Sequence, residues 1–249
     1  MHRIGLQTYT IRERMSTAED CCATLRTVRE QGYDFVQLYG RFPRLEQEAN
    51  ACREVGMPVI GTVITMDMCD DEPDRLISLL KTYGMTDISV SSSVKTEAET
   101  LDFITRANAF AERVTAEGLT FSYHNHSTEF VRTECGKTVM QLMLEGFSEK
   151  VNYMPDTYWI QDGGFDVRHF LELTAGKYRH VHLKDMKKVD KTQHTFAPLG
   201  EGNLWLPGII NTALAGGADT FIVEQDICEE DQLLCAEKSI AYLRGLNLL

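Results

Sequence analysis

The sequence contains no run of about 18 apolar residues, so it predicts no membrane-spanning helix. It also lacks an apolar signal segment, because His2 and Arg3 open the chain and Gln7 soon follows. Basic residues are few: 25 Lys and Arg stand against 37 Asp and Glu, for a formal net charge of −12. Because nucleic-acid binding needs a basic surface, we expect no nucleic-acid partner, and a strongly anionic substrate is disfavoured.

Sequence motifs for nucleotide binding and cysteine patterns for zinc or disulfide sites are absent as well. No Gly-x-Gly-x-x-Gly follows the first predicted strand and no Walker A sequence occurs, so the main signals of nucleotide binding are missing. The seven cysteines are scattered and include no CxxC pair. An odd number of unclustered cysteines indicates free thiols in a reducing cytoplasm rather than a disulfide framework or a zinc site.

What the sequence does contain is a regular alternation of short apolar strands and longer helical segments. The predicted strands cover residues 4–9, 35–38, 59–64, 87–90, a stretch that begins at Thr120, 151–156, 180–183 and 220–224. The predicted helices cover residues 16–30, 45–55, 73–80, 96–117, 138–144, 167–175, 205–215 and 229–246, and a polar loop runs from 184 to 202. Ser16 and Glu19 have the spacing of a capping box, and Asp166 is the expected N-cap of the helix over 167–175.

Strands that alternate with helices, with no break in composition, favour a parallel sheet. A chain of 249 residues also matches the length of a single α/β barrel, which is typically about 250 residues. We therefore predict an α/β protein, a (β/α)8 TIM barrel, with one domain over residues 1–249. In such a barrel the carboxyl ends of the strands converge on one mouth, where active sites lie.

Imidazole and carboxylate side chains stand at the ends of the last four predicted strands. In chain order they are His124, His126, Glu129, Asp156, His182 and Glu224. Residues i and i+2 of an extended chain point to the same face, so the two histidines of the fifth strand would point the same way if the strand continues that far. Carboxylate and imidazole together suit a divalent ion, which would act as a Lewis acid on a carbonyl.

Several segments of the chain together resemble the sugar phosphate isomerase/epimerase family of the xylose isomerase-like TIM barrel superfamily. These segments are Gly5–Arg12, Tyr123–His126 with Glu129 and Phe130, Asp156–Trp159, His180–Asp185, Leu199–Gly202 and Val223–Asp226. The resemblance extends over essentially the whole chain. It implies one divalent ion bound by a Glu-Asp-His-Glu set at the ends of strands five to eight.

Asp156, His182 and Glu224 match this ligand set directly. At the first position the family has a Glu at or near the place of His124, and the nearest carboxylate here is Glu129. We expect Glu129 to be the ligand, with His124 and His126 moving protons or binding substrate; the reverse assignment, with His124 as the ligand, stays open. Members of the family with the His-Asn-His pattern resemble inosose dehydratases and lyases of 3-keto-glycosides. The resemblance therefore makes elimination an alternative to simple epimerisation.

For each of several other residues near the strand ends, the sequence fits two different roles. Lys184 is either a solvated loop lysine or a catalytic group that contacts a substrate oxygen, and Glu224 either binds the ion or pairs with Lys184. Tyr9, Tyr158 and Trp159 are either sugar-stacking faces or rim packing; we assign them, with Asn125, to substrate binding. The remaining residues receive the plainer reading: His180 is packed, and Lys187, Lys188 and Lys191 form a solvated surface.

We expect a metal-dependent sugar isomerase or epimerase that abstracts a proton next to a carbonyl, with Glu224 and the flanking His and Glu residues in the proton transfer. The alternatives are a metal-dependent lyase or dehydratase of a keto-sugar, 3-keto-glycoside or inosose, and a noncatalytic sugar-binding barrel. A DNA-repair endonuclease of the same fold would need a basic groove, which the charge of −12 disfavours.

The expected cofactor is one divalent ion, Mn²⁺ in the first place, with Co²⁺, Mg²⁺, Fe²⁺ and Zn²⁺ as alternatives. The expected partner is a small-molecule sugar, neutral rather than phosphorylated, and a homo-oligomer is left open. We expect no membrane partner and a cytoplasmic location.

Overall fold

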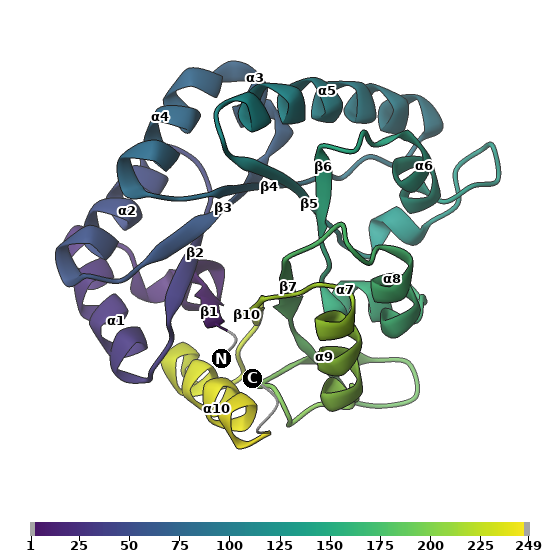
Figure 1. Ribbon diagram of the computed structural model, residues 1–249. Helices are drawn as coiled ribbons and strands as arrows, with labels where there is room; N and C mark the ends of the chain where they lie inside the picture. Colours follow the sequence, from purple (N-terminus) through teal and green to yellow (C-terminus); the bar gives the residue numbers. More distant parts are fainter. Residues whose placement is uncertain (1–2, 247–249) are drawn as a thin grey trace.

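A closed ring of parallel strands surrounded by helices makes up the computed structural model, which describes residues 3–246 (Figure 1). Within these residues, eight strands form one parallel sheet in the order β6-β5-β4-β3-β2-β1-β10-β7. The strands are β1 (Arg3–Gln7), β2 (Phe35–Tyr39), β3 (Val59–Thr65), β4 (Asp87–Ser91), β5 (Thr120–His124), β6 (Val151–Met154), β7 (His180–Leu183) and β10 (Thr220–Val223). The predicted single-domain TIM barrel is confirmed, and residues 1, 2 and 247–249 of the predicted domain lie outside the described part.

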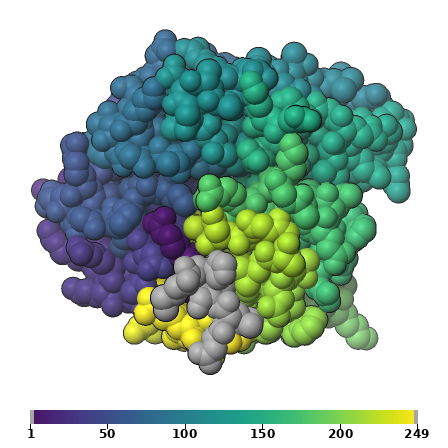
Figure 2. Space-filling view, viewed as in Figure 1, coloured from purple at the N-terminus to yellow at the C-terminus, as the bar shows by residue number. Residues whose placement is uncertain are grey.

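The first and last strands of the chain are neighbours in the ring. Residues 3–6 of β1 pair in parallel with residues 220–223 of β10, and Figure 2 shows the purple start of the chain beside the yellow-green segment near its end. The ring closes between β6 and β7 with a single parallel bridge, Asp156 to His182, in which the His182 N–H donates to the Pro155 carbonyl at 2.9 Å. The seam of the barrel therefore lies at two of the residues predicted to bind an ion.

Helices connect the strands and cover the outside of the ring. They are α1 (Ala18–Glu30), α2 (Arg44–Val55), α3 (Met66–Asp71), α4 (Pro73–Tyr83), α5 (Glu97–Ala116), α6 (Val139–Gly146), α7 (Thr157–Asp162), α8 (Val167–Leu173), α9 (Leu206–Ala215) and α10 (Gln232–Gly245). Asp166 caps α8 as predicted. The capping box of α1 begins one residue later than predicted, because Thr17 and Asp20 make both reciprocal bonds.

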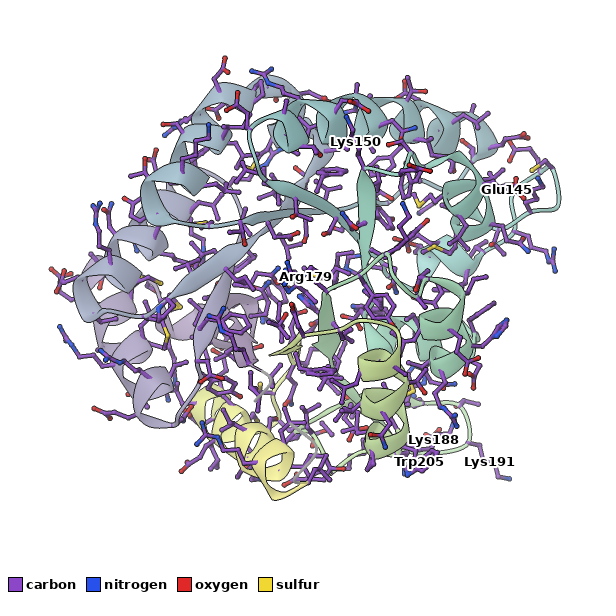
Figure 3. All side chains as sticks on the ribbon, in the orientation of Figure 1. Glu145, Lys150, Arg179, Lys188, Lys191 and Trp205 are labelled. Atoms are coloured by element: carbon purple, nitrogen blue, oxygen red, sulfur yellow. The ribbon has the colours of Figure 1, made fainter. Side chains whose placement is uncertain are left out.

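Four local predictions were wrong or incomplete. The first strand ends at Gln7, because residues Thr8–Arg14 turn into a 3-10 helix. The short helices α3 and α7 were not predicted; α3 follows β3 directly, and α7 begins after Pro155 with Asp156 as its N-cap. The loop predicted after residue 184 contains a hairpin of β8 (Asp185–Lys188) and β9 (His194–Ala197). Lys188 and Lys191 point away from the ring of strands (Figure 3), as expected for a solvated surface.

Alternate residues of each strand point into the barrel, and this alternation creates the floor of the site. A small apolar cluster of Phe35, Ile60, Met154 and Ile222 lies inside the ring. Gly5 is needed beside it, since a Cβ at this position would stand 2.2 Å from the Phe35 ring. The apolar layer leaves the polar strand ends together at one mouth. Among the described helices, none has the length and apolar character to cross a membrane.

Candidate active site

Four of the strand-end groups meet at the mouth of the barrel. One ligand atom each of His124, Asp156, His182 and Glu224 lies within 4.8 Å of the others. All four side chains are buried, with exposed fractions between 0% and 7%. Buried carboxylates and imidazoles whose ligand atoms converge in this way are a donor set that divalent ions bind, so this cluster is a candidate metal centre.

The Asp156 carboxylate both faces the cluster and caps a helix. Its Oδ1 accepts a hydrogen bond from the Trp159 N–H at 3.0 Å and caps α7. Its backbone N–H donates to Oδ1 of Asn125 at 3.0 Å, which leaves Oδ2 facing Nε2 of His124 at 3.2 Å. The helix cap fixes the carboxylate so that one oxygen remains for an ion.

Lys184 is fully buried, which rules out the reading as a solvated loop lysine. Its Nζ lies 3.2 Å from Asp156 Oδ2, 3.1 Å from Glu224 Oε2 and 2.7 Å from Asp226 Oδ1. Burial disfavours a charged lysine, but the three carboxylates outweigh it and raise the pKa of Lys184 above its ordinary value. Lys184 also lowers the pKa of Glu224 against the effect of burial. The three carboxylates and the one ammonium together carry a formal charge of −2, which one divalent ion would neutralise.

A chain of amide groups sets the tautomer of His182. The Tyr9 N–H donates to Oε1 of Gln7 at 3.3 Å, so Nε2 of Gln7 donates to Oε1 of Gln37 at 2.8 Å. The same Gln37 oxygen lies 2.6 Å from Nε2 of His182 and can only accept, which places the imidazole proton on Nε2. Burial lowers the pKa of His182, so the ring is neutral and its Nδ1 lone pair faces Glu224 Oε2 at 2.7 Å.

Two acceptors that face each other at this distance repel unless a cation lies against both. The donor set therefore fits a divalent ion held by His182 Nδ1, a Glu224 oxygen, Asp156 Oδ2 and His124. Gln7 and Gln37 were not predicted as site residues. Their signal in the sequence is a glutamine within an otherwise apolar strand, and both are buried.

Glu129, predicted as the first ligand, is not part of this cluster. Its Oε1 accepts from the Tyr123 hydroxyl at 2.5 Å and from the His126 N–H at 3.1 Å, and its Oε2 accepts from the Thr128 hydroxyl at 3.0 Å. The chain turns into a short 3-10 helix at Thr128–Phe130, which directs this carboxylate back toward β5. His124 takes the place beside Asp156, as in the assignment that the sequence left open.

β5 ends at His124, so His126 does not continue the strand, yet the two rings remain close, with centroids 5.1 Å apart. Burial lowers the pKa of His126 to about 3, and nearby His124 and Lys184 act in the same direction. The His126 ring is therefore neutral and can both donate and accept a hydrogen bond. Within residues 3–246, Nδ1 of His124 and Nδ2 of Asn125 are buried without a hydrogen-bond partner.

A cavity of about 340 Å³ opens above the cluster. His124, His182, Lys184 and Glu224 form its floor, and Tyr9, Tyr39, Arg41 and Asp226 line its sides. Tyr9 therefore lines this cavity, and Trp159 lines a neighbouring cavity that also contacts His126. Tyr158 instead stacks on Phe196, with ring centroids 4.0 Å apart, so it has the packing role that was the alternative to sugar stacking. Asn125 holds the backbone of Asp156 and lines neither cavity.

His180 and the cysteines follow the plainer predictions. His180 is buried below the cluster, where its Nδ1 bonds to Thr220 and burial lowers its pKa. All seven cysteines lie in the described part of the chain and are free thiols.

A parallel β/α barrel with a buried acid–imidazole cluster at its mouth defines the class of the protein: a TIM barrel with a candidate metal centre. The chain belongs to the xylose isomerase-like TIM barrel family, whose family model matches residues 25–246. Among curated proteins, none matches the chain in sequence.

Solved structures of similar fold have low sequence identity to the chain. A sugar phosphate isomerase/epimerase from Parabacteroides distasonis has a TM-score of 0.83 at 20% identity, over 99% of this chain and 95% of that one. A xylose isomerase-like TIM barrel protein from Mycobacterium smegmatis in complex with magnesium has a TM-score of 0.72 at 17% identity, over 99% and 97%. The 3-keto-D-glucoside 4-epimerase from E. coli has a TM-score of 0.72 at 16% identity, over 98% and 100%. At these identities the similarity shows the fold.

Proposed function

We propose that the protein is a divalent-metal-dependent isomerase or epimerase of a sugar or keto-sugar. The observation that carries the proposal is the buried cluster of His124, Asp156, His182 and Glu224, which together with Lys184 and Asp226 has a formal charge of −2 beneath an open cavity. A similar barrel was solved with magnesium and another is an epimerase of a keto-glucoside, which supports the same chemistry here. Mixed imidazole and carboxylate donors favour Mn²⁺, Fe²⁺, Co²⁺ or Zn²⁺ over Mg²⁺.

When bound, the ion would supply Lewis-acid polarisation of a substrate carbonyl. The protein's own groups would bind and orient the sugar and transfer its proton. Lys184 brings an ammonium to the same oxygens and can donate a hydrogen bond to a substrate oxygen that gains negative charge. Its carboxylate partner Asp226 lies 2.7 Å away and would hold the ammonium if Asp156 and Glu224 held an ion.

Proton transfer needs a group on each face of the reacting carbon if the product is an epimer. His126 follows β5 and Asp226 follows β10, which are not neighbours in the ring, and both line the cavity above the cluster. The Asp226 carboxylate can accept a proton and the His126 ring can donate one, so groups of both kinds approach the cavity from different sides. Removal of a proton by one and return by the other would invert the carbon.

The test is a screen of keto- and aldo-sugars with the metal-loaded protein in deuterium oxide. We expect deuterium at the carbon next to the carbonyl, together with an isomerised or epimerised product. An unsaturated product with loss of a substituent would identify a lyase instead. Absence of exchange with every sugar, in protein that binds both sugar and metal, would favour the noncatalytic barrel. The free thiols suit a reducing cytoplasm, where we place the protein.

Replacing Gln37 with leucine should weaken divalent-ion affinity by about 10- to 100-fold, the usual cost of losing a group that orients a ligating histidine. The change removes the acceptor that holds the proton of His182 on Nε2. Titration calorimetry with Mn²⁺ measures the effect. Gln31→Leu is the control, because Gln31 bonds to the Leu233 carbonyl away from the mouth. Equal affinities for both variants would contradict the role of Gln37.

A further inference from the structure

A second cavity adjoins the one above the cluster. It has a volume of about 650 Å³, and both cavities fall in the range of about 300–1,000 Å³ that is common for small-molecule sites. The two share Thr65, Ser91 and His126, so one continuous cleft runs across the mouth. Residues at the ends of β1, β2, β7 and β10 line only the first cavity, residues after β6 line only the second, and β3, β4 and β5 contribute to both. The cleft therefore extends beyond the region directly above the cluster of His124, Asp156, His182 and Glu224.

The lining of the second cavity suits a polar ring with flat apolar faces. Ser91, Ser92, Ser93 and Thr128 supply hydroxyl groups along one side. Trp159, Val94 and Phe103 supply apolar surface, and the Trp159 indole N–H is buried without a hydrogen-bond partner among the described residues. Aromatic surface beside hydroxyl donors and acceptors is what a sugar ring contacts, because its faces carry C–H groups and its edge carries hydroxyls.

The charges around the second cavity argue against a phosphate there. Its cation is Arg106, whose guanidinium is paired with Asp67, Asp70 and Asp102 and is therefore already neutralised. A phosphorylated sugar would instead place its phosphate near Arg41, which lines the first cavity and donates to the Thr65 hydroxyl at 3.2 Å. The second cavity would then have no occupant.

We propose that the substrate is a keto-glycoside, with the keto-sugar ring above the cluster and a second sugar ring in the cavity of Ser91–Ser93 and Trp159. This inference rests on the proposed function. A glycosidic bond locks the ring, so the carbonyl must lie on a ring carbon other than the anomeric one. In the reaction, a C–H proton next to that carbonyl moves to a protein base, and the electrons of the C–H bond form an enediolate. A proton then returns to the same carbon, so no other reactant is needed.

His126 connects the two parts of the cleft. Its ring lies 5.1 Å from that of His124 and 5.4 Å from that of Trp159, centroid to centroid. One side of this imidazole therefore faces the cluster and the other faces the second cavity. That position is suited to the glycosidic junction, where His126 can bond to an oxygen of either ring.

The test compares three probes on the metal-loaded protein: keto-cellobiose and keto-maltose, each oxidised in its non-reducing ring, and the matching methyl keto-glucoside. Titration calorimetry gives the affinity of each, and deuterium uptake is read separately. We expect keto-cellobiose, or its α-linked counterpart keto-maltose, to bind at least about 10-fold tighter than the methyl glycoside, which corresponds to about 1.4 kcal/mol. Equal affinities for the methyl glycoside and both disaccharides would overturn the proposal, as would tighter binding of a sugar phosphate.

A variant that fills the second cavity alone completes the test. Ser93 is exposed, lines only the second cavity and makes no side-chain hydrogen bond within the described residues, so Ser93→Trp should fold. We expect this variant to lose the advantage of the disaccharide while the methyl glycoside binds as in the wild type; Ser93→Ala is the control. If Ser93→Trp weakens the disaccharides and the methyl glycoside alike, the second cavity is not a separate subsite. Deuterium uptake without the affinity difference would refute the subsite and leave the proposed function standing. The affinity difference without deuterium uptake would refute the proposed function, and with it the keto-glycoside as substrate, and would leave only a second sugar-binding subsite.

Discussion

Replacing Lys184 with methionine is expected to lower the free energy of unfolding of the metal-free protein by about 3–5 kcal/mol, the usual cost of removing one partner from a buried ion pair. Without the ammonium, the carboxylates of Asp156, Glu224 and Asp226 remain together at the mouth with no cation. Excess Mn²⁺ should restore much of the loss, because an ion that binds only the folded state stabilises it. Denaturant unfolding with a chelator and then with Mn²⁺ measures both effects.

Lys238→Met provides a matched control at the surface. Lys238 pairs with Glu201 and Glu230 but is partly exposed, and exposed ion pairs contribute little to stability because solvent screens them. We expect this control to unfold as the wild type does, with and without Mn²⁺. If Lys184→Met in chelator also unfolds as the wild type does, then Lys184 does not balance the charge of the cluster.

Replacing Glu224 with glutamine is expected to lower kcat/KM by about 10³-fold with the fold retained. The amide keeps the shape of the side chain but removes a charge that faces His182 and Lys184. Loss of several kcal/mol of charge stabilisation in the transition state slows a reaction tenfold for every 1.4 kcal/mol or so. Steady-state kinetics on the sugar identified by the deuterium screen gives the rate, and circular dichroism checks the fold.

The control for this variant is Glu237→Gln, which makes the same chemical change at an exposed position of α10. It should leave kcat/KM within about twofold of the wild type, since surface changes away from the site have little effect. Turnover by Glu224→Gln at the wild-type rate, with metal bound, would show that the Glu224 carboxylate takes no part in the reaction.

The barrel and most of the cluster could be predicted because both follow from short periodic patterns. Alternation within a strand and the convergence of parallel strands at one mouth place Asp156, His182 and Glu224 together without knowledge of any contact. The inward position of Lys184 follows from the same alternation, since it is the second residue after His182. The interpretation of Lys184 as a solvated loop lysine, left open beside a catalytic role, missed that continuation.

The residues that could not be predicted depend on the path of loops. The chain after β5 turns within a few residues, and the Tyr123 hydroxyl captures Glu129, so spacing alone could not choose between Glu129 and His124. The hairpin of β8 and β9 has no clear alternation in its first strand, where Asp185 is followed by Met186 and two lysines. The shared cleft depends on where three loops meet, which no single segment encodes.

Titration of Mn²⁺ into metal-free wild type, His124→Ala and Glu129→Gln tests most directly whether one ion binds within this cluster. We predict one ion per chain for the wild type, an affinity lower by about 10-fold or more for His124→Ala, and nearly unchanged affinity for Glu129→Gln. Failure of the wild type to bind Mn²⁺, or loss of binding in Glu129→Gln but not in His124→Ala, would contradict this placement of the ion.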